Sequence, residues 1–354
     1  MKTFKDFIQN SRTFVFIGNG GTGKTTVSAS WALELAKTGA RVGLLTIDPS
    51  KRLGDAFGMN IETEFYKTVA VGTGSVDIFL VDAKRVIEDF VTDHFSKEQY
   101  DKIKNNRIFS QVSSALSENQ SVSTIYKLHK IMKSKDYDKI IVDTPPSNNS
   151  MDFFTSPDFV VRIFKENILA RAALETKSFS FFSGQKLFRR VYTFLVGEDF
   201  FKDIEVFFQI LFLFQDYIVK SSQDLMDILR EAETHFVAVT LPDSAKVQEV
   251  LSVVQKLSQQ NIDVKTLIIN RAYPSWLGPL SSAMSFEPSE AEIDSYYKLV
   301  LHYFSEQSRR AKELAAGINS SLGVYFLPEN SSELETEGVE GFSSHLLKMF
   351  EEKK

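Results

Sequence analysis

A glycine-rich segment near the start of the chain carries residue types that bind phosphate. It reads GNGGTGKT from Gly18 to Thr25, which fits the pattern G-x-x-x-x-G-K-[ST]. Glycines let the backbone pass close to a phosphate, so that successive N–H groups can point at it where a helix begins. Lys24 can reach the terminal phosphates of a nucleotide, and the Thr25 hydroxyl can bind Mg²⁺. An apolar run precedes the segment and a helical pattern follows it, a context that favours nucleotide binding over a chance glycine-rich turn.

Two aspartates follow apolar runs further along the chain. Asp48 ends VGLLTID, and Asp143 ends KIIVD. If both runs are parallel strands, both carboxylates lie at the sheet edge where open α/β sheets bind ligands. Asp143 is then the expected Mg²⁺ ligand, directly or through water. Asp48 becomes the candidate to orient or deprotonate the attacking water. Taken alone, either aspartate is equally well explained as a turn or helix-cap residue.

A third apolar run, KTLIIN, ends at Asn270. Its amide can donate and accept hydrogen bonds with the edge of adenine. Asparagine is also common in turns, so this residue supports a nucleotide site only together with the glycine-rich segment.

The elements that must position these residues alternate along the chain. Short runs rich in Val, Ile, Leu or Phe indicate strands buried on both faces, and longer helical patterns separate them. The expected strands are Thr13–Ile17, Val42–Ile47, Lys139–Val142, Phe236–Thr240, Lys265–Ile269 and Gly323–Leu327. The expected helices are Lys24–Thr38, Ala245–Gln259, Ala291–Ala316 and Val339–Glu352. This alternation predicts an α/β fold with a mostly parallel, twisted sheet flanked by helices.

Two helical stretches, roughly 85–135 and 151–232, interrupt the alternation. The second is rich in phenylalanine, with 15 of the 31 Phe residues between Phe153 and Phe214. We therefore expect a single domain over 1–354, with a helical subdomain formed from these two insertions. Its phenylalanines either form a hydrophobic groove for a client segment or pack internally.

Composition narrows the classes of function. The chain has 354 residues, 43% of them apolar, and a net charge of −5, which argues against a dedicated nucleic-acid binder. It has no cysteine, which excludes disulfides, thiolate zinc sites and iron–sulfur clusters. The start of the chain is polar, and the most apolar stretch, VFFQILFLF, is too short to cross a bilayer. We expect a cytoplasmic protein with at most peripheral membrane contact, whose amphipathic C-terminal segment packs on the core.

Four segments together resemble one family. They are GNGGTGKTT at 18–26, TIDPSKRLGDAFG at 46–58, DTPPSNNSMDFF at 143–154 and IIN at 268–270. They look like the arsenical pump-driving ATPases and the related ATPases that target tail-anchored membrane proteins, which belong to the deviant Walker A class. The resemblance runs from residue 13 to the Leu-Pro pair at 327–328. The forms TIDP and DTPPS resemble a bacterial branch of the family. It implies a P-loop NTPase fold, ATP and Mg²⁺ as ligands, and a dimer that closes around ATP and handles a protein or membrane-associated client.

The resemblance also implies residue roles. Asp48 would orient the attacking water and lies in the first switch segment, 46–58. Asp143 would lie in the second switch segment, 143–154, and Asn270 would contact adenine. The expected catalytic residues are Asp48 and Lys24, and the expected metal ligands are Thr25 and Asp143. The expected nucleotide contacts are Gly20, Gly21, Thr22, Gly23, Lys24, Thr25, Thr26, Asn270 and Pro328.

The chain departs from the family pattern at three places. Asn19 stands where the class has a lysine that reaches the partner's phosphates, and a cation supplied in trans can be worth about 10³–10⁵ in rate. The absence of cysteine removes both the arsenite-binding thiolates and the zinc clamp of the relatives. The family's TGH after the second switch is replaced by Ser147-Asn148-Asn149.

These departures leave alternatives open. The leading interpretation is an ATP-hydrolysing dimer, formed with itself or with a related ATPase. It either hydrolyses ATP slowly or uses Lys51 or Arg52 in place of the lysine that Asn19 replaces. The alternative is a low-turnover regulatory or scaffold subunit of a heteromer. A small-molecule kinase or ligase on the same core ranks last, because no further substrate motif stands out.

Overall fold

The computed structural model describes residues 10–47, 53, 57, 66–81, 83–104, 120–146, 198–274, 277, 291–319, 321–329, 339 and 346. The chain divides into two units, each described by itself. The first comprises Met1–Leu80, Ile131–Thr155 and Ile228–Lys354, and the second comprises Val81–Lys130 and Ser156–Asp227. The domain boundaries expected from the sequence stay a prediction.

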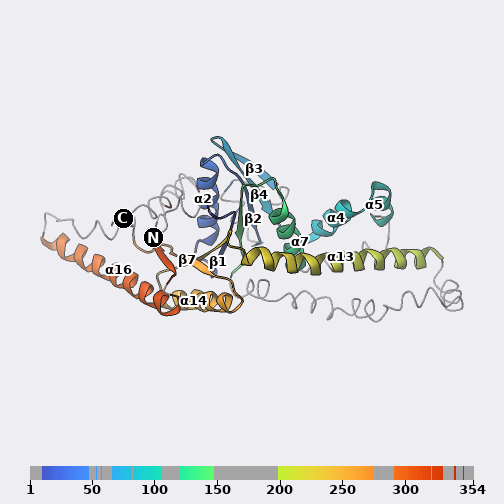
Figure 1. Ribbon diagram of the computed structural model, residues 1–354. Coiled ribbons are helices and arrows are strands. Elements are labelled where there is room, and N and C mark those ends of the chain that lie inside the picture. The colour runs from blue at the N-terminus through green and yellow to red at the C-terminus, as the bar shows by residue number, and fades with distance from the viewer. Residues whose placement is uncertain are drawn as a thin grey trace. The chain divides into compact units, whose positions relative to one another are not determined.

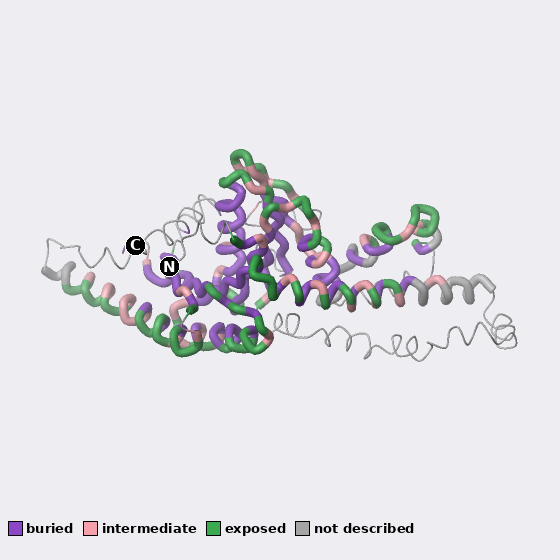
Figure 2. Tube along the Cα trace, viewed as in Figure 1, coloured by how far each residue is buried: buried purple, intermediate pink, exposed green. Residues whose placement is uncertain are grey.

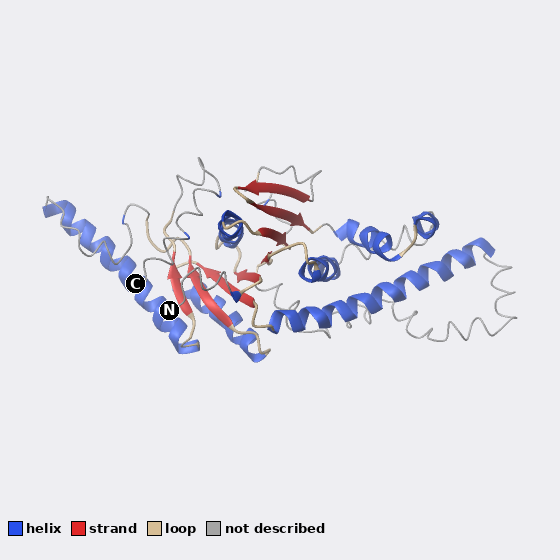
Figure 3. Cartoon of the chain, turned by 45° about the horizontal axis from the view of Figure 1, so that its top comes forward, coloured by secondary structure: helices blue, strands red, loops and turns tan. Residues whose placement is uncertain are grey.

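An eight-stranded sheet lies at the centre of the described part of the first unit (Figures 1 and 3). The strands are β1 (Thr13–Gly18), β2 (Arg41–Thr46), β3 (Tyr66–Val71), β4 (Gly74–Leu80), β5 (Lys139–Asp143), β6 (Thr234–Thr240), β7 (Val264–Ile269) and β8 (Gly323–Phe326). Their order across the sheet is β3-β4-β2-β5-β1-β6-β7-β8. Every neighbouring pair is parallel except β3 and β4. The mostly parallel α/β sheet predicted from the sequence is therefore confirmed.

Three helices in the described part of the first unit flank this sheet: α2 (Lys24–Lys37), α14 (Ser244–Gln259) and α16 (Ala291–Ile318). Helix α2 packs on β2, β4 and β5, α14 packs on β6 and β7, and α16 packs on α14 and β8. All three were predicted at these positions.

The helices α4 (Ala83–His94), α5 (Lys97–Lys104), α7 (Gln120–Lys133) and α13 (Glu198–Arg230) fall wholly or mostly in the second unit. No helix among the described residues is both long enough and apolar enough to span a membrane.

The core of the first unit includes the interface between β1 and α2. Strand β1 is buried along its whole length (Figure 2). Phe14 and Phe16 place their rings 5.6 and 5.5 Å from that of Trp31 on α2, so strand and helix share one aromatic cluster. Val339 and the fully buried Leu346 belong to the same apolar cluster. These two described residues of the C-terminal segment thus pack on the core, as the sequence predicted.

The β3–β4 hairpin is an element that the sequence analysis did not predict. Both strands carry charged residues, Lys67 in β3 and Asp77 in β4, so neither stands out as an apolar run. A two-residue loop joins them, with Gly72 at a positive φ of 58°. Two short runs separated by Gly-Thr are a hairpin signal that would have identified the pair.

Candidate functional site

The glycine-rich segment joins the end of β1 to the start of α2. Gly23, the residue before the helix, adopts the left-handed conformation with φ of 79°, and no side chain of the described residues caps the helix. The first turn of α2 also lacks acidic residues. Its N–H groups and the positive end of the helix dipole therefore suit an anion. A pocket forms here, lined by residues 19–26 together with Pro146.

Two of the glycines are required because another group lies close to their Cα atoms, a backbone carbonyl at one and a side-chain amide at the other. A Cβ atom on Gly18 would lie 2.2 Å from the carbonyl oxygen of Val239 on β6. A Cβ atom on Gly23 would lie 2.3 Å from the side-chain nitrogen of Asn270. Both distances are far below contact, so the course of the loop depends on the absence of side chains at these positions.

The Asp143 carboxylate lies at the end of β5, fully buried beside the loop. The Thr25 hydroxyl donates to Oδ2 of Asp143 at 2.8 Å. The ammonium of Lys24 lies 3.5 Å from Oδ1, close enough for an ion pair. Oδ1 receives no hydrogen bond from the part of the chain that the structure describes. The structure therefore brings together three of the predicted site residues, Lys24, Thr25 and Asp143.

Asn270 braces the phosphate loop from the end of β7. Its side-chain N–H donates to the carbonyl oxygen of Thr22 at 2.8 Å, and its side-chain oxygen accepts from the Arg271 amide at 3.0 Å. The residue is 4% exposed. An amide has two N–H donors and two acceptor lone pairs, and these two contacts use one of each. The bracing contact is a role that the sequence analysis did not foresee.

Asn19 faces a helix of its own chain. It is 4% exposed, and its side-chain nitrogen lies 3.5 Å from the main-chain oxygen of Lys246 in the first turn of α14. That turn is capped by Asp243, whose carboxylate accepts from the Lys246 amide at 3.0 Å. The position that carries a lysine in the class is therefore packed against α14 here.

The remaining predicted residues lie as follows. Gly20 and Gly21 are exposed, and Thr26 is half-buried; all three line the pocket. Pro328 is buried and directly follows Leu327, whose amide donates to the carbonyl oxygen of Ile269 on β7. The residues outside the described part of the chain are Asp48, Lys51, Arg52, Ser147, Asn148 and Asn149.

Two residues of the site were missed by sequence reasoning. Thr46, the last residue of β2, donates its hydroxyl to Oδ2 of Asp143 at 3.2 Å. Pro146 lines the pocket together with the loop residues. Thr46 lies two positions before Asp48, and Pro146 three after Asp143, so adjacency to the predicted carboxylates is the signal that would have suggested them.

Comparison with known proteins identifies the family of this chain. The model of the family described as anion-transporting ATPase matches residues 11–308. ATPase GET3 of Malassezia globosa is 24% identical over 305 residues, covering 84% of this chain and 83% of that protein. ATPase ASNA1 homolog 1 of Paramecium tetraurelia is 24% identical and covers 76% and 78% of the two chains. Putative arsenical pump-driving ATPase 2 of Aquifex aeolicus is 25% identical and covers 74% and 81%.

The family match begins before β1 and extends well into α16, so it includes the phosphate loop, Asp143 and Asn270. The resemblance inferred from the four sequence segments is thereby confirmed. This chain belongs to the anion-transporting ATPase family.

Proposed function

We propose that this protein binds ATP in the pocket of residues 19–26 and hydrolyses it with the help of Mg²⁺. The observation that carries the proposal is the convergence of Lys24 and Thr25 on the buried Asp143 carboxylate, beside a helix N-terminus that no described side chain caps. Lys24 and the loop N–H groups bind and neutralise the phosphates. Asn270 and Pro328 contact the adenine, and Asp48 orients the attacking water.

The residues beside the loop fit a magnesium ion. Mg²⁺ prefers oxygen ligands, and Asp143 Oδ1 is a buried carboxylate oxygen without a hydrogen bond from the described residues. The Thr25 hydroxyl donates its proton to Oδ2, which leaves its own lone pairs for a cation. Thr25 and Asp143 would hold the ion, directly or through water. When bound, Mg²⁺ neutralises charge on the phosphates.

We further propose that the protein works as a nucleotide-gated dimer, with itself or with a related ATPase, on a hydrophobic protein client or a membrane-associated one. Membership of the family and the likeness of the two switch segments support this proposal. The phenylalanine-rich stretch that would form the client groove lies mostly outside the described residues, so groove and internal packing stay as alternatives.

A low-turnover regulatory or scaffold subunit of a heteromer is the second candidate. One observation favours it: Asn19 carries no charge and packs on α14 of its own chain. A neutral amide cannot neutralise the charge that develops on transferring phosphate.

Steady-state ATP hydrolysis and binding of a fluorescent ADP analogue test the proposal. Lys24→Ala is expected to weaken ADP binding by about tenfold or more, since it removes a cation from the phosphates. Asp48→Asn is expected to retain binding and lose turnover. Unchanged binding in Lys24→Ala would contradict the phosphate site, and unchanged turnover in Asp48→Asn would remove that residue from its role.

Asn19→Lys separates the two candidates. If the wild-type chain is a slow subunit, restoring the cation raises its turnover by about tenfold or more. Fast turnover of the wild type, with no gain in Asn19→Lys, would contradict the regulatory-subunit candidate.

A further inference from the structure

The two oxygens of the Asp143 carboxylate have different surroundings. Oδ2 accepts two hydroxyl hydrogen bonds, from Thr25 at 2.8 Å and from Thr46 at 3.2 Å. Oδ1 receives no hydrogen bond from the described residues and faces the Lys24 ammonium at 3.5 Å. Since the carboxylate is fully buried, these donors decide how it is oriented.

Thr46 is suited to fix that orientation because its own place is set by the sheet. It is 2% exposed and lies directly beside Asp143 in the parallel β2–β5 pair. The next residue, Ile47, donates its amide to the main-chain oxygen of Asp143 at 2.9 Å, so the two strand ends are joined at backbone and side chain. A β-branched side chain in a strand has few rotamers, which keeps the hydroxyl in place.

Thr25 differs from Thr46 in its position. It lies in the first turn of α2, at the end of the phosphate loop, where its oxygen would also ligate the metal. The Thr46 hydroxyl donates to Oδ2 of Asp143 from the end of a strand. Thr46 is therefore the strand-borne donor that holds Oδ2 while Thr25 serves the metal.

We propose that Thr46 is a positioning residue for Mg²⁺-nucleotide binding. Its hydroxyl holds Oδ2 of Asp143 and so keeps Oδ1 directed at the metal and phosphate side of the site. This inference rests on the proposed ATP site. Without the hydroxyl, the buried carboxylate loses one of two hydrogen bonds and turns toward the Lys24 ammonium. A tighter Lys24–Asp143 pair then competes with the phosphates for Lys24 and with the metal for Asp143.

The test measures the affinity of the full chain for a fluorescent ADP analogue, with MgCl₂ and with EDTA. The ratio of the two dissociation constants is the Mg²⁺ enhancement. Thr46→Val keeps the shape and removes the hydroxyl, and is expected to reduce the enhancement by about tenfold, as for the loss of a hydrogen bond to a charged group. Thr46→Ser keeps the donor and is expected to stay within about twofold of wild type.

Thr234→Val is the matched control. Thr234 is another buried strand threonine whose hydroxyl donates a hydrogen bond, to Ile228 O at 2.7 Å, but it begins β6 at the opposite end of the sheet from the loop. The Mg²⁺ enhancement of the Thr234→Val variant should equal that of wild type. If Thr46→Val does not fold, Thr46→Ala makes the same comparison.

The outcomes separate the inference from the function on which it rests. A folded Thr46→Val or Thr46→Ala with wild-type enhancement overturns the positioning role and leaves the ATP site standing. Equal losses in Thr46→Val, Thr46→Ser and Thr234→Val also overturn it, because they reflect general damage to the sheet. A wild-type chain without affinity for the ADP analogue overturns both proposals.

Discussion

Asn270 and Gly23 form a tight contact that holds the phosphate loop against the end of β7. The Asn270 amide reaches the carbonyl oxygen of Thr22 at 2.8 Å, and the missing side chain of Gly23 leaves room for it. A second hydrogen bond inside the loop, from the Thr22 hydroxyl to the Asn19 carbonyl at 3.0 Å, fixes the turn further. The shape of the loop thus depends on a residue far away in the sequence.

The bracing role predicts the effect of Asn270→Ala. Loss of the buried hydrogen bond should loosen the loop and weaken binding of both ADP and GDP by about fivefold to tenfold, with a further loss for ADP because the proposed adenine contact is also removed. The measurement is the dissociation constant of both nucleotides, with Asn319→Ala as control, since Asn319 lies at the end of α16 outside the site. A loss confined to ADP would mean that Asn270 acts on the adenine base alone.

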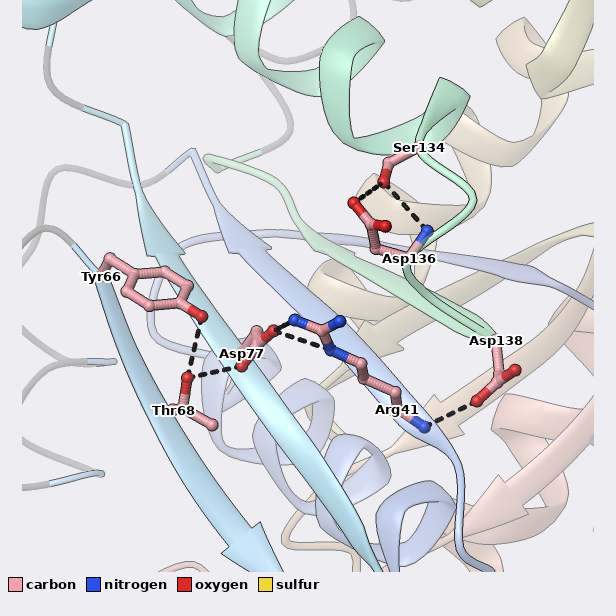
Figure 4. Close-up of polar contacts among 7 residues, drawn as sticks. All are labelled: Arg41, Tyr66, Thr68, Asp77, Ser134, Asp136 and Asp138. Atoms are coloured by element: carbon pink, nitrogen blue, oxygen red, sulfur yellow. Dashed lines mark hydrogen bonds and ion pairs between the residues drawn. The ribbon is translucent and has the colours of Figure 1, made fainter.

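At the scale of elements, the β3–β4 hairpin is attached to β2 by a polar network (Figure 4). The buried Asp77 of β4 accepts two hydrogen bonds from the Arg41 guanidinium, at 2.8 and 3.2 Å, and one from the Thr68 hydroxyl at 2.7 Å. Burial alone would raise the pKa of Asp77, but its hydrogen bonds, foremost those from Thr68 and Arg41, together outweigh burial and lower the pKa below its usual value. One carboxylate therefore links three adjacent strands.

This network predicts a pH-dependent effect of Asp77→Asn on stability. Because the folded-state pKa lies below the unfolded one, the contribution of Asp77 is fully present above an unfolded pKa of about 3.9 and is lost as pH falls through the folded-state pKa. Near neutral pH the substitution should cost about 1–3 kcal/mol of unfolding free energy. The difference from wild type should shrink below about pH 4.

Urea unfolding followed by tryptophan fluorescence measures this, because Trp31 is fully buried in the core of the first unit, which also contains this network. Asp136→Asn is the control. Asp136 accepts a hydrogen bond from Ser134 (Figure 4), but it is exposed. Asp136→Asn should therefore change the unfolding free energy by no more than about 0.5 kcal/mol. If the unfolding free energy of Asp77→Asn lies below that of wild type by the same amount at every pH, the lowered pKa of Asp77 is contradicted.

At the scale of the whole molecule, the two units rely on different cores. The second unit has an aromatic cluster in which Phe90 of α4 contacts Tyr126 of α7 and both Phe214 and Tyr217 of α13. The ring centroids of Phe90 and Phe214 lie 4.8 Å apart, and Phe90 is 1% exposed. Tyr126 also donates to Asp93 of α4, which joins the same helices through a polar contact. This cluster contains no residue of the phosphate site.

Phe90→Ala should therefore weaken the second unit selectively. Loss of a fully buried phenylalanine costs about 3–5 kcal/mol. Hydrogen exchange is expected to become faster in α4 and α7, whereas β1 and β5 keep their protection. Leu213→Ala on α13 is the control, since Leu213 is 52% exposed and should change exchange little. Equal loss of protection in both units would mean that they unfold together.

The predicted and unpredicted parts of the fold differ in how local their signals are. Strands such as β1 and β5 are buried on both faces, so their apolar runs identified them directly. The edge strand β3 and its neighbour β4 are partly exposed and carry Lys67 and Asp77, which weakened the apolar signal. The burial of Asp77 becomes favourable only through its hydrogen bonds to Arg41 and Thr68, a match between strands that periodicity does not contain.

Taken alone, the sequence determined the phosphate loop, the main parallel strands and the family, because contiguous residues encode each of these features. Only the tertiary structure decided how the site residues meet. Thr25 and Asp143 are 118 positions apart, Asn19 and Lys246 are 227 apart, and Asn270 and Thr22 are 248 apart. The parallel pairing of β2 and β5 decides which oxygen of Asp143 meets Thr46. The packing of α14 decides which way Asn19 faces. Both bring together groups that no local sequence pattern relates.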